Sequence, residues 1–233
     1  MISFNKVKNI KIIKKMLIIP GILVVIASFL TNVFLYQKLQ KTEKFFIVKK
    51  VFDGDSFALE QGPGIRLGNL YAPELELCGG QESKQRLEEL ILDKKVKLDI
   101  FSFDQYKRSI ALVYVGKTLV NEVMLKEGWA RYDGSPSPER SRLKEAYDYA
   151  FENKKGIFSS LCRSEEPDDP KCIIKGNISR ADGSKTYHFP GCSEYSAVIV
   201  EKDLGEQWFC AEKEALQAGF TKAQNCFGKK FKL

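Results

Sequence analysis

The sequence lacks several features that would have pointed to other classes of protein. No cysteine precedes Cys78, so the amino-terminal part offers no cysteine for lipid modification. No internal repeat is present, which excludes a repeat array. The chain beyond Lys44 has no net charge, because residues 1–44 hold eight lysines and one glutamate and account for the whole +7. The basic overall charge therefore does not indicate a phosphate-binding surface in the rest of the protein.

A long apolar run, MLIIPGILVVIASFLTNVFLY, occupies residues 16–36. At about 1.5 Å per residue, its 21 residues match the ~30 Å hydrocarbon core of a bilayer. Five lysines precede the run and three follow it closely, a bias that favours a cytoplasmic basic tail over 1–15. A cleaved signal peptide is the alternative, but the run is long for one and no small-x-small cleavage site follows. We therefore expect one transmembrane helix in a single-pass membrane protein, with its N-terminus cytoplasmic and the remainder extracytoplasmic.

The composition after the apolar run suits one medium domain and something smaller. Short β-rich runs punctuated by turns predict a small β-barrel or sandwich. The runs are FFIVKKVF (45–52), SFALE (56–60), GIRLGNL (64–70), KVKLDIF (95–101) and SIALVYV (109–115). Apolar spacing predicts helices over 83–94, 119–126 and 138–154. The fold class expected is α+β and mainly β.

Four local features in this β-rich part could carry chemistry. They are DGDS at 53–56, Arg66 on a strand-like run, APE at 72–74, and DQYKRSIALVYV at 104–115. Taken singly, each has an ordinary explanation. Asp-Gly-Asp between strands is usually a plain turn, and a strand arginine or a glutamate after proline is usually solvated surface.

In this order and spacing, the four features resemble the staphylococcal nuclease (thermonuclease) family. There, an Asp-Gly-Asp-Thr turn, an Arg-Leu strand ending in Asp-x-Pro-Glu, and an Asp-x-Tyr-Gly-Arg segment build one site. The resemblance covers about 45–162 and includes VNEVMLKEGWAR (120–131) and KKGIFSSLC (154–162). It implies a five-stranded OB-fold barrel with packed helices, and an endonuclease that hydrolyses phosphodiester bonds of DNA or RNA with the assistance of Ca²⁺.

The chemistry of phosphodiester hydrolysis explains why these residue types are needed. Arg66 and Arg108 would stabilise the extra negative charge of the transition state, since a guanidinium can donate two hydrogen bonds to a phosphate. Glu74 would orient or deprotonate the attacking water. By the resemblance, Asp55 would bind Ca²⁺ together with the backbone carbonyl of Ala72, and Asp53 would lie in the outer shell of the ion.

The chain departs from the family pattern at two positions. Tyr71 stands where the family has a metal-binding aspartate, and a neutral phenol is a poor Ca²⁺ ligand. The site could bind Ca²⁺ weakly, recruit Glu74 or Glu76, or be a catalytically inactive binder. Lys107 stands where the family has glycine, which changes a loop conformation more than a role. The neighbouring Tyr106 could stack on a substrate base or be a partly buried strand-end residue.

All six cysteines fall on the predicted outer side, where disulfides persist. Sequence alone allows 15 pairings of three bridges. Because extracytoplasmic relatives resemble this chain in the positions of two cysteines, we expect a Cys78–Cys162 bridge around the barrel domain. The remaining cysteines lie in the carboxyl-terminal part: Cys172, Cys192, Cys210 and Cys226.

An acidic, proline-bearing stretch, 163–170, is typical of a linker, and 171–233 would form a small cysteine-stapled module. The module resembles one sometimes called the sunset domain, found appended to such nucleases. A helix is expected after Cys210, ended by Gly219, and a turn at 203–205 between two strands. Two staples are possible: a Zn²⁺ site that includes His188, or the disulfides Cys192–Cys210 and Cys172–Cys226, which we favour. The module would recognise an unknown partner.

Two rival functions remain open at this point. One is a non-catalytic OB-fold module that binds nucleic acid or protein, motivated by Tyr71 and the neutral outer part. The other is a mainly structural envelope protein whose carboxyl-terminal module carries the function.

Overall fold

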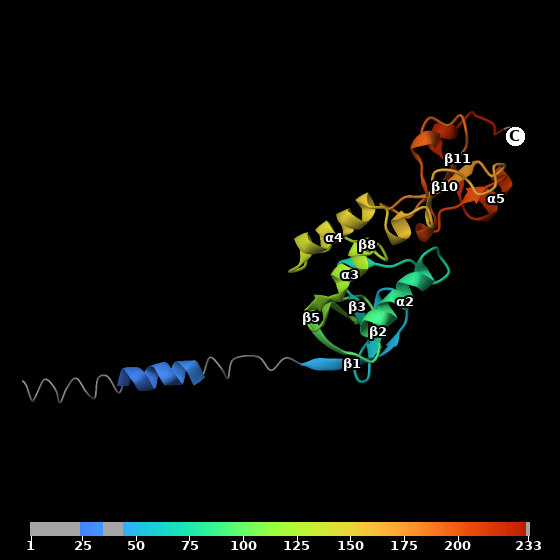
Figure 1. Cartoon of the computed structure of the whole chain (residues 1–233). Helices are drawn as coiled ribbons and strands as arrows, with labels where there is room; N and C mark the ends of the chain where they lie inside the picture. The colour runs from blue at the N-terminus through green and yellow to red at the C-terminus, as the bar shows by residue number, and fades with distance from the viewer. Residues whose placement is uncertain (1–23, 35–43, 232–233) are drawn as a thin grey trace, which may run out of the picture. The chain divides into compact units, whose positions relative to one another are not determined.

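The computed structural model describes residues 24–34 and 44–231, and contacts divide the chain into two units, Met1–Glu43 and Lys44–Leu233. In the first unit, residues 24–34 form a helix (Figure 1). No helix in the described ranges is both long and apolar enough to cross a membrane.

The predicted transmembrane helix over 16–36 is therefore wrong. With it, the predicted single-pass topology is wrong, and the predicted membrane partner and extracytoplasmic location have no support from the described residues. Residues 16–23 and 35–36 of that prediction lie outside the described residues, as does the predicted basic tail over 1–15.

The second unit begins with a closed β-barrel. Its strands are β1 (Phe45–Val51), β2 (Ser56–Leu59), β3 (Ile65–Leu67), β5 (Lys95–Phe103), β6 (Ser109–Val115) and β7 (Thr118–Leu119). They are hydrogen-bonded in the order β3-β2-β1-β5-β6-β7, and β3 also pairs in parallel with β6. This extra pairing closes β1, β2, β3, β5 and β6 into a barrel, consistent with the predicted OB-like fold. β-branched and aromatic residues favour these strands because their side chains pack well on a pleated surface.

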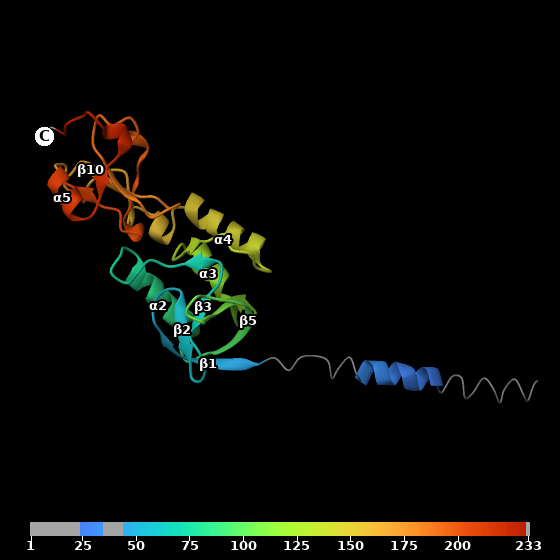
Figure 2. The same ribbon diagram turned by 180° about the vertical axis from the view of Figure 1, so that it is seen from behind.

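Three helices pack on the barrel: α2 (Gly80–Ile91), α3 (Val120–Lys126) and α4 (Arg140–Glu152). In both ribbon views α4 lies along α3 on one side of the barrel (Figures 1 and 2). The three elements bury apolar faces against one core, represented by Leu87 of α2, Met124 of α3 and Leu143 of α4, all fully buried. The helical spacing read from the sequence is confirmed in all three places.

A second, smaller pairing joins β4 (Leu70–Tyr71) to β8 (Arg131–Tyr132), with Tyr71 opposite Arg131. β4 lies at the end of the predicted Arg-Leu strand, and β8 follows the Gly-Trp-Ala segment. Ser83 of α2 donates a hydrogen bond to the Trp129 carbonyl (2.8 Å), which holds α2 against the approach to β8. The β4–β8 pair therefore connects the start of the APE segment to the residues that follow α3.

The carboxyl-terminal module is built on a second sheet, in the order β13-β10-β11-β14. Its strands and helices are β10 (Ile174–Ile178), β11 (Lys185–His188), β13 (Trp208–Phe209), α5 (Glu212–Gln217) and β14 (Thr221–Lys222). Short 3₁₀ turns complete it: η2 (Tyr195–Ala197), η3 (Lys202–Leu204) and η4 (Gln224–Cys226). Gly219 follows α5 at φ 84°, the left-handed conformation typical of the residue after a helix.

The module is joined to the barrel domain by a short antiparallel pair. β9 (Arg163–Ser164) pairs with β12 (Val200–Glu201), so the predicted linker over 163–170 begins as a strand. η1 (Gly156–Phe158) precedes it, and η3 follows β12 directly. The expected turn at 203–205 is present, with Gly205 at φ 84°.

All six cysteines are paired in the structure. Cys78 is joined to Cys162, which is the pair expected from the family's relatives. In the module the bridges are Cys172–Cys210 and Cys192–Cys226, so the partners are exchanged relative to the favoured pairing. No described cysteine is free, and the Zn²⁺ alternative therefore has no thiolates. His188 is buried, with its Nε2 3.4 Å from the Thr186 hydroxyl.

Candidate active site

The turn between β1 and β2 carries the two aspartates of the DGDS stretch. Asp53 Oδ1 accepts hydrogen bonds from the Asp55 N–H (3.0 Å) and from the Ser56 hydroxyl (2.8 Å), so this carboxylate holds the turn. Gly54 is needed for a reason other than a positive φ, a conformation it does not adopt. A Cβ at this position would lie 1.9 Å from the Ser83 hydroxyl oxygen on α2. The glycine thus allows the turn to approach the helix closely.

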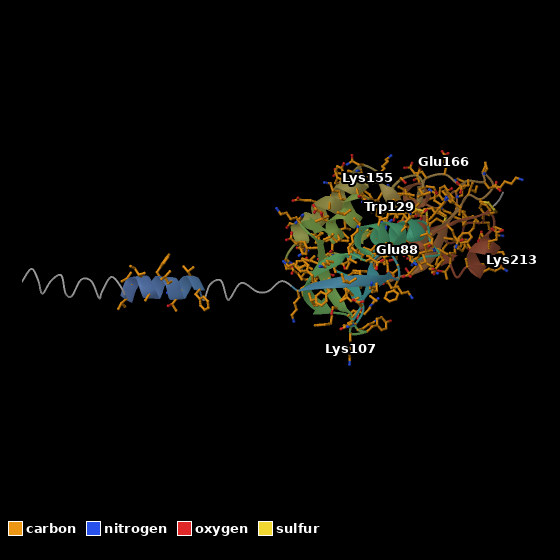
Figure 3. The ribbon with its side chains drawn as sticks, turned by 60° about the horizontal axis from the view of Figure 1, so that its bottom comes forward. Glu88, Lys107, Trp129, Lys155, Glu166 and Lys213 are labelled. Atoms are coloured by element: carbon orange, nitrogen blue, oxygen red, sulfur yellow. A yellow bond between two sulfur atoms is a disulfide. The ribbon has the colours of Figure 1, made fainter. Side chains whose placement is uncertain are left out.

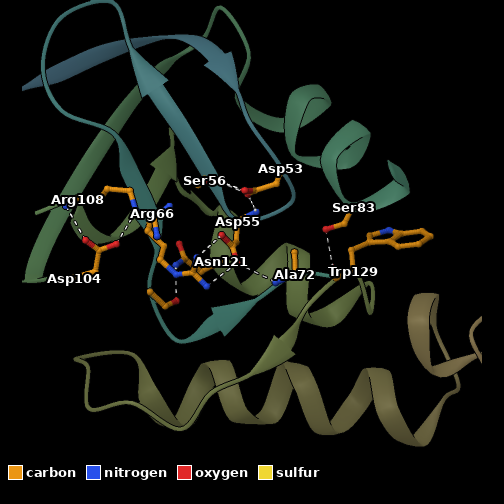
Figure 4. Close-up of polar contacts among 11 residues, drawn as sticks. Asp53, Asp55, Ser56, Arg66, Ala72, Ser83, Asp104, Arg108, Asn121 and Trp129 are labelled. Carbon is orange, nitrogen blue, oxygen red and sulfur yellow. Dashed lines mark hydrogen bonds and ion pairs between the residues drawn. The ribbon is translucent and has the colours of Figure 1, made fainter. Parts of the chain in front are cut away.

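Asp55 and Arg66 form the central ion pair of the site (Figure 4). The Arg66 guanidinium donates to both carboxylate oxygens, with NH1–Oδ1 and NH2–Oδ2 distances of 2.9 Å. The pairing of β2 with β3 sets Ser56 opposite Arg66. Asp55, the residue before Ser56, therefore lies next to Arg66. Asp55 Oδ2 also accepts the Ala72 N–H at 3.1 Å. One buried carboxylate therefore anchors both a strand arginine and the APE segment.

Burial dominates the electrostatics of Asp55, which is only 4% exposed. It raises the pKa of this carboxyl to about 6, although the charge of Arg66 opposes the shift. The neighbouring Asp53 adds to the rise, while the Ala72 hydrogen bond and the charge of Arg108 lower the pKa. The influence of Arg108 means that its guanidinium lies within electrostatic reach of Asp55.

Arg108 is held by a tight turn between β5 and β6. Asp104 Oδ1 accepts the N–H groups of Tyr106 (2.8 Å) and Arg108 (2.9 Å), and Asp104 Oδ2 accepts Arg108 Nε at 2.6 Å. Within 24–34 and 44–231, the other two guanidinium nitrogens of Arg108 make no hydrogen bond or ion pair. Tyr106 is 72% exposed, and the Arg108 guanidinium carbon lies 5.7 Å from its ring centre. Of the two roles predicted for Tyr106, the partly buried strand-end residue is therefore not what the structure has.

Glu74 is the predicted base, and the structure places it two residues after the Asp55-bound Ala72. Its carboxylate is exposed and makes no hydrogen bond or ion pair with any residue of the described ranges. Buried Pro73 precedes it and restricts the backbone there. Glu74 also lines a small cavity of about 180 Å³ together with Tyr71 and Leu77.

Tyr71 lines the same cavity as Arg131 and Asp203, whereas Asp55 does not line it. Burial raises the pKa of the Tyr71 phenol, and the charges of Arg131 and Arg180 oppose that rise. Tyr71 is therefore a neutral residue that faces the carboxyl-terminal module.

These residues do not fit a Ca²⁺ site of the family type. Both oxygens of Asp55 already serve Arg66, and the second carboxylate of the pattern is replaced by the phenol of Tyr71. Within 24–34 and 44–231, one group of three His, Cys, Asp or Glu ligand atoms lies within 4.8 Å, namely Asp169, Cys172 and Cys210. Its two cysteines form a disulfide. Asp53 holds the DGDS turn and Asp55 is paired with Arg66, so few oxygens remain for a cation that takes six to eight.

Sequence reasoning missed two residues that shape the site. Asn121 is fully buried and joins three backbone groups: its Oδ1 accepts Val113 N–H, and its Nδ2 donates to the carbonyls of Gly68 and Ala111. Arg131 is 2% exposed and is paired with Asp203. The VNEV and GWAR stretches contain both residues, but nothing local distinguishes them from surface polar residues.

Comparison with known proteins agrees with this geometry. A family model described as "Staphylococcal nuclease homologue" matches residues 64–160. A protein of Haemophilus influenzae named "Uncharacterized endonuclease" is 33% identical over 129 residues, covering 53% of this chain and 68% of that relative. The micrococcal nuclease of Shigella flexneri is 29% identical over 138 residues, covering 52% of this chain and 76% of the nuclease.

A plant relative shares only the same region. The "Probable staphylococcal-like nuclease CAN4" of Oryza sativa is 36% identical over 92 residues, which is 38% of this chain and 19% of the rice protein. The matched families and relatives are nucleases, and the matched region contains Arg66, Glu74 and Arg108. This chain belongs to the staphylococcal nuclease family.

Proposed function

We propose that the protein is an endonuclease that hydrolyses phosphodiester bonds of DNA or RNA at the Arg66–Arg108 end of the barrel. The observation that carries the proposal is the Asp55–Arg66 pair, with Arg108 in electrostatic reach of the same carboxylate. Two guanidinium groups that never lose their charge supply the fixed cations that a five-coordinate phosphorus transition state requires.

The two arginines have different freedom to bind the phosphate. Arg66 uses one hydrogen on each terminal nitrogen for Asp55, and its side chain is 28% exposed. Arg108 uses Nε for Asp104, so its two terminal nitrogens present a fork for bidentate binding. Arg66 is thus the more rigidly oriented cation, and Arg108 is the group that binds a non-bridging phosphate oxygen.

Glu74 is the base that takes a proton from the attacking water. Its exposed carboxylate has no competing partner among the described residues, which leaves it available to a water molecule. Pro73 restricts the backbone just before it, and the Ala72 N–H bond to Asp55 ties the segment to the arginine site. The leaving oxygen receives its proton from solvent, so no second acidic residue is needed.

Ca²⁺ dependence, expected from the family, is not carried by these residues as arranged. We assign no step to a metal ion, and the two arginines supply the positive charge. A weak ion held by the Ala72 carbonyl, Glu74 and water is tested by the cleavage assay below.

The second candidate is a nucleic-acid-binding domain without catalysis. It is favoured by one observation, the replacement of a family aspartate by Tyr71, whose side chain faces Arg131 and Asp203. A binder would need the arginines and Tyr106 but not the exposed Glu74.

The test is cleavage of a labelled single-stranded DNA and a matched RNA by the oxidised protein, with millimolar Ca²⁺ or with chelator. Glu74→Gln keeps the size of the side chain and removes the base, and Glu76→Gln is its matched control on the same exposed segment. The proposal predicts cleavage that Glu74→Gln lowers at least 100-fold and Glu76→Gln leaves within about threefold. Tight binding of both nucleic acids with no cleavage in any buffer would favour the binder.

A further inference from the structure

The segment that carries Ala72 and Glu74 is anchored at its start by an ion pair with the carboxyl-terminal module. Tyr71 is paired across the β4–β8 ladder with Arg131. Arg131 donates from Nε and NH2 to the two Asp203 oxygens, at 2.6 and 3.0 Å, and NH2 lies 3.3 Å from a Glu201 oxygen. Arg131 and Asp203 are 2% and 3% exposed, so this contact is solvent-free.

The same segment is anchored at its end by the disulfide Cys78–Cys162. The Cys162 carbonyl accepts the Lys202 N–H at 2.7 Å, and β9, which follows Cys162, pairs with β12 of the module. The turn η3 (Lys202–Leu204) therefore reaches both ends of residues 71–78, once through Asp203 and once through Lys202.

Between these two anchors, the module and the segment share one cavity wall. Asp203 and Leu204 line the ~180 Å³ cavity from one side, and Ala72, Pro73 and Glu74 line it from the other. Just beyond, a Cβ built on Gly205 would lie 3.7 Å from a Leu77 methyl group, so the segment packs directly on the turn. A small displacement of this turn would move the backbone that holds the base.

From these contacts, we propose that the carboxyl-terminal module is a working part of the active site, in which Asp203 and Arg131 act as positioning residues for the Ala72–Glu74 segment. The proposal rests on the proposed function for its kinetic consequence, but the contacts themselves do not. It also explains the departure at position 71. An aspartate there would add a second carboxylate to the cavity that Asp203 already lines, whereas a neutral tyrosine does not.

The test uses the full oxidised chain and four variants. Asp203→Asn removes the charge that holds Arg131 while keeping the volume, and Asp203→Glu restores the charge. Glu206→Gln is the matched control, because Glu206 is a buried acid of the module (4% exposed) that accepts the N–H groups of Ile178 and Glu201 and does not line the cavity. Leu204→Ala keeps the ion pair and shortens a side chain that lines the cavity, and it serves if Asp203→Asn does not fold.

Two quantities are measured: amide hydrogen exchange of the peptide covering 71–78, and the split of cleavage between kcat and KM. We expect Asp203→Asn and Leu204→Ala to speed exchange of this peptide at least tenfold and to lower kcat about tenfold. KM should stay within twofold, because the arginines that bind phosphate lie on β3 and before β6. Asp203→Glu should recover most of kcat.

Exchange and kcat of Asp203→Asn and Leu204→Ala that stay within twofold of Glu206→Gln would overturn the proposal. Equal loss of kcat in Glu206→Gln would also overturn it, since the effect would then follow from general destabilisation. If the parent protein cleaves nothing, the proposed function fails, and hydrogen exchange alone decides whether the module positions the segment.

Discussion

Lys107 offers a sharp test of how the Arg108 turn is built. It adopts φ 62° at a position where the family pattern has glycine. The conformation is imposed by its neighbours, since Asp104 binds the N–H groups of Tyr106, Lys107 and Arg108 through its side chain and carbonyl. Figure 3 shows the Lys107 side chain extending away from the barrel. Among the described residues, no contact of this side chain therefore offsets the cost of the left-handed backbone conformation.

The expected gain from Lys107→Gly follows from two opposing terms. A left-handed conformation costs a residue with a Cβ about 1–2 kcal/mol, which glycine does not incur. Glycine also lowers the free energy of unfolding by about 0.4–1 kcal/mol, because it gives the unfolded chain more conformational freedom. The midpoints of the two ranges leave a net stabilisation of about 0.8 kcal/mol. For a unit of about 190 residues, this raises Tm by roughly 1–4 °C.

The assay is thermal unfolding of the oxidised protein followed by circular dichroism, in chelator. Lys107→Ala is the matched control, because it removes the charge and the long side chain but keeps the Cβ. It should leave Tm within 1 °C of the parent, on the order of the ordinary surface substitution. Equal Tm values for Lys107→Gly and Lys107→Ala would refute the reasoning, because the gain would then come from charge or not exist.

Three further perturbations test other parts of the structure. Tyr106→Ala should weaken binding of single-stranded DNA by about 1–3 kcal/mol, while Tyr106→Phe keeps the ring and the affinity. Fluorescence anisotropy with a short labelled strand measures both affinities. An equal loss of affinity in the two variants would exclude stacking. Asn121→Ala should lower the free energy of unfolding by about 2–5 kcal/mol, because the Val113 N–H and the Gly68 carbonyl lose buried partners. Urea unfolding measures this free energy, and a loss below about 1 kcal/mol would contradict the assigned role. Replacing Cys78 and Cys162 together by serine removes a bridge that spans 84 residues. The chain-entropy model predicts that this bridge stabilises the folded protein by about 4.5 kcal/mol. The same urea titration should show the loss, and an unchanged midpoint would mean that the bridge does not constrain the unfolded chain.

The sequence alone predicted the local elements of the barrel domain. The β-rich runs around 45–70 and 95–115 became β1, β2, β3, β5 and β6, and the three helical stretches became α2, α3 and α4. These are short-range patterns, in which the spacing of apolar residues states which face will be buried. The family pattern also singled out Asp55, Arg66 and Arg108, which the structure brings to one end of the barrel.

The apolar run over 16–36 shows the limit of such patterns. Its composition suits a membrane helix, but the described part of the chain contains no helix of the required length and apolarity.

Only the tertiary structure decided which groups satisfy one another. Arg131 and Asp203 are 72 residues apart, and the sequence offered Asp203 only as part of a turn. The side of the backbone that Tyr71 faces, the commitment of both Asp55 oxygens to Arg66, and the pairing of Cys172 with Cys210 were likewise invisible. Each depends on closing a long loop and on the register of a distant strand, whereas local propensity acts only over a few residues. For this reason the sequence predicted the candidate site residues, and the fold decided which partners each of them already has.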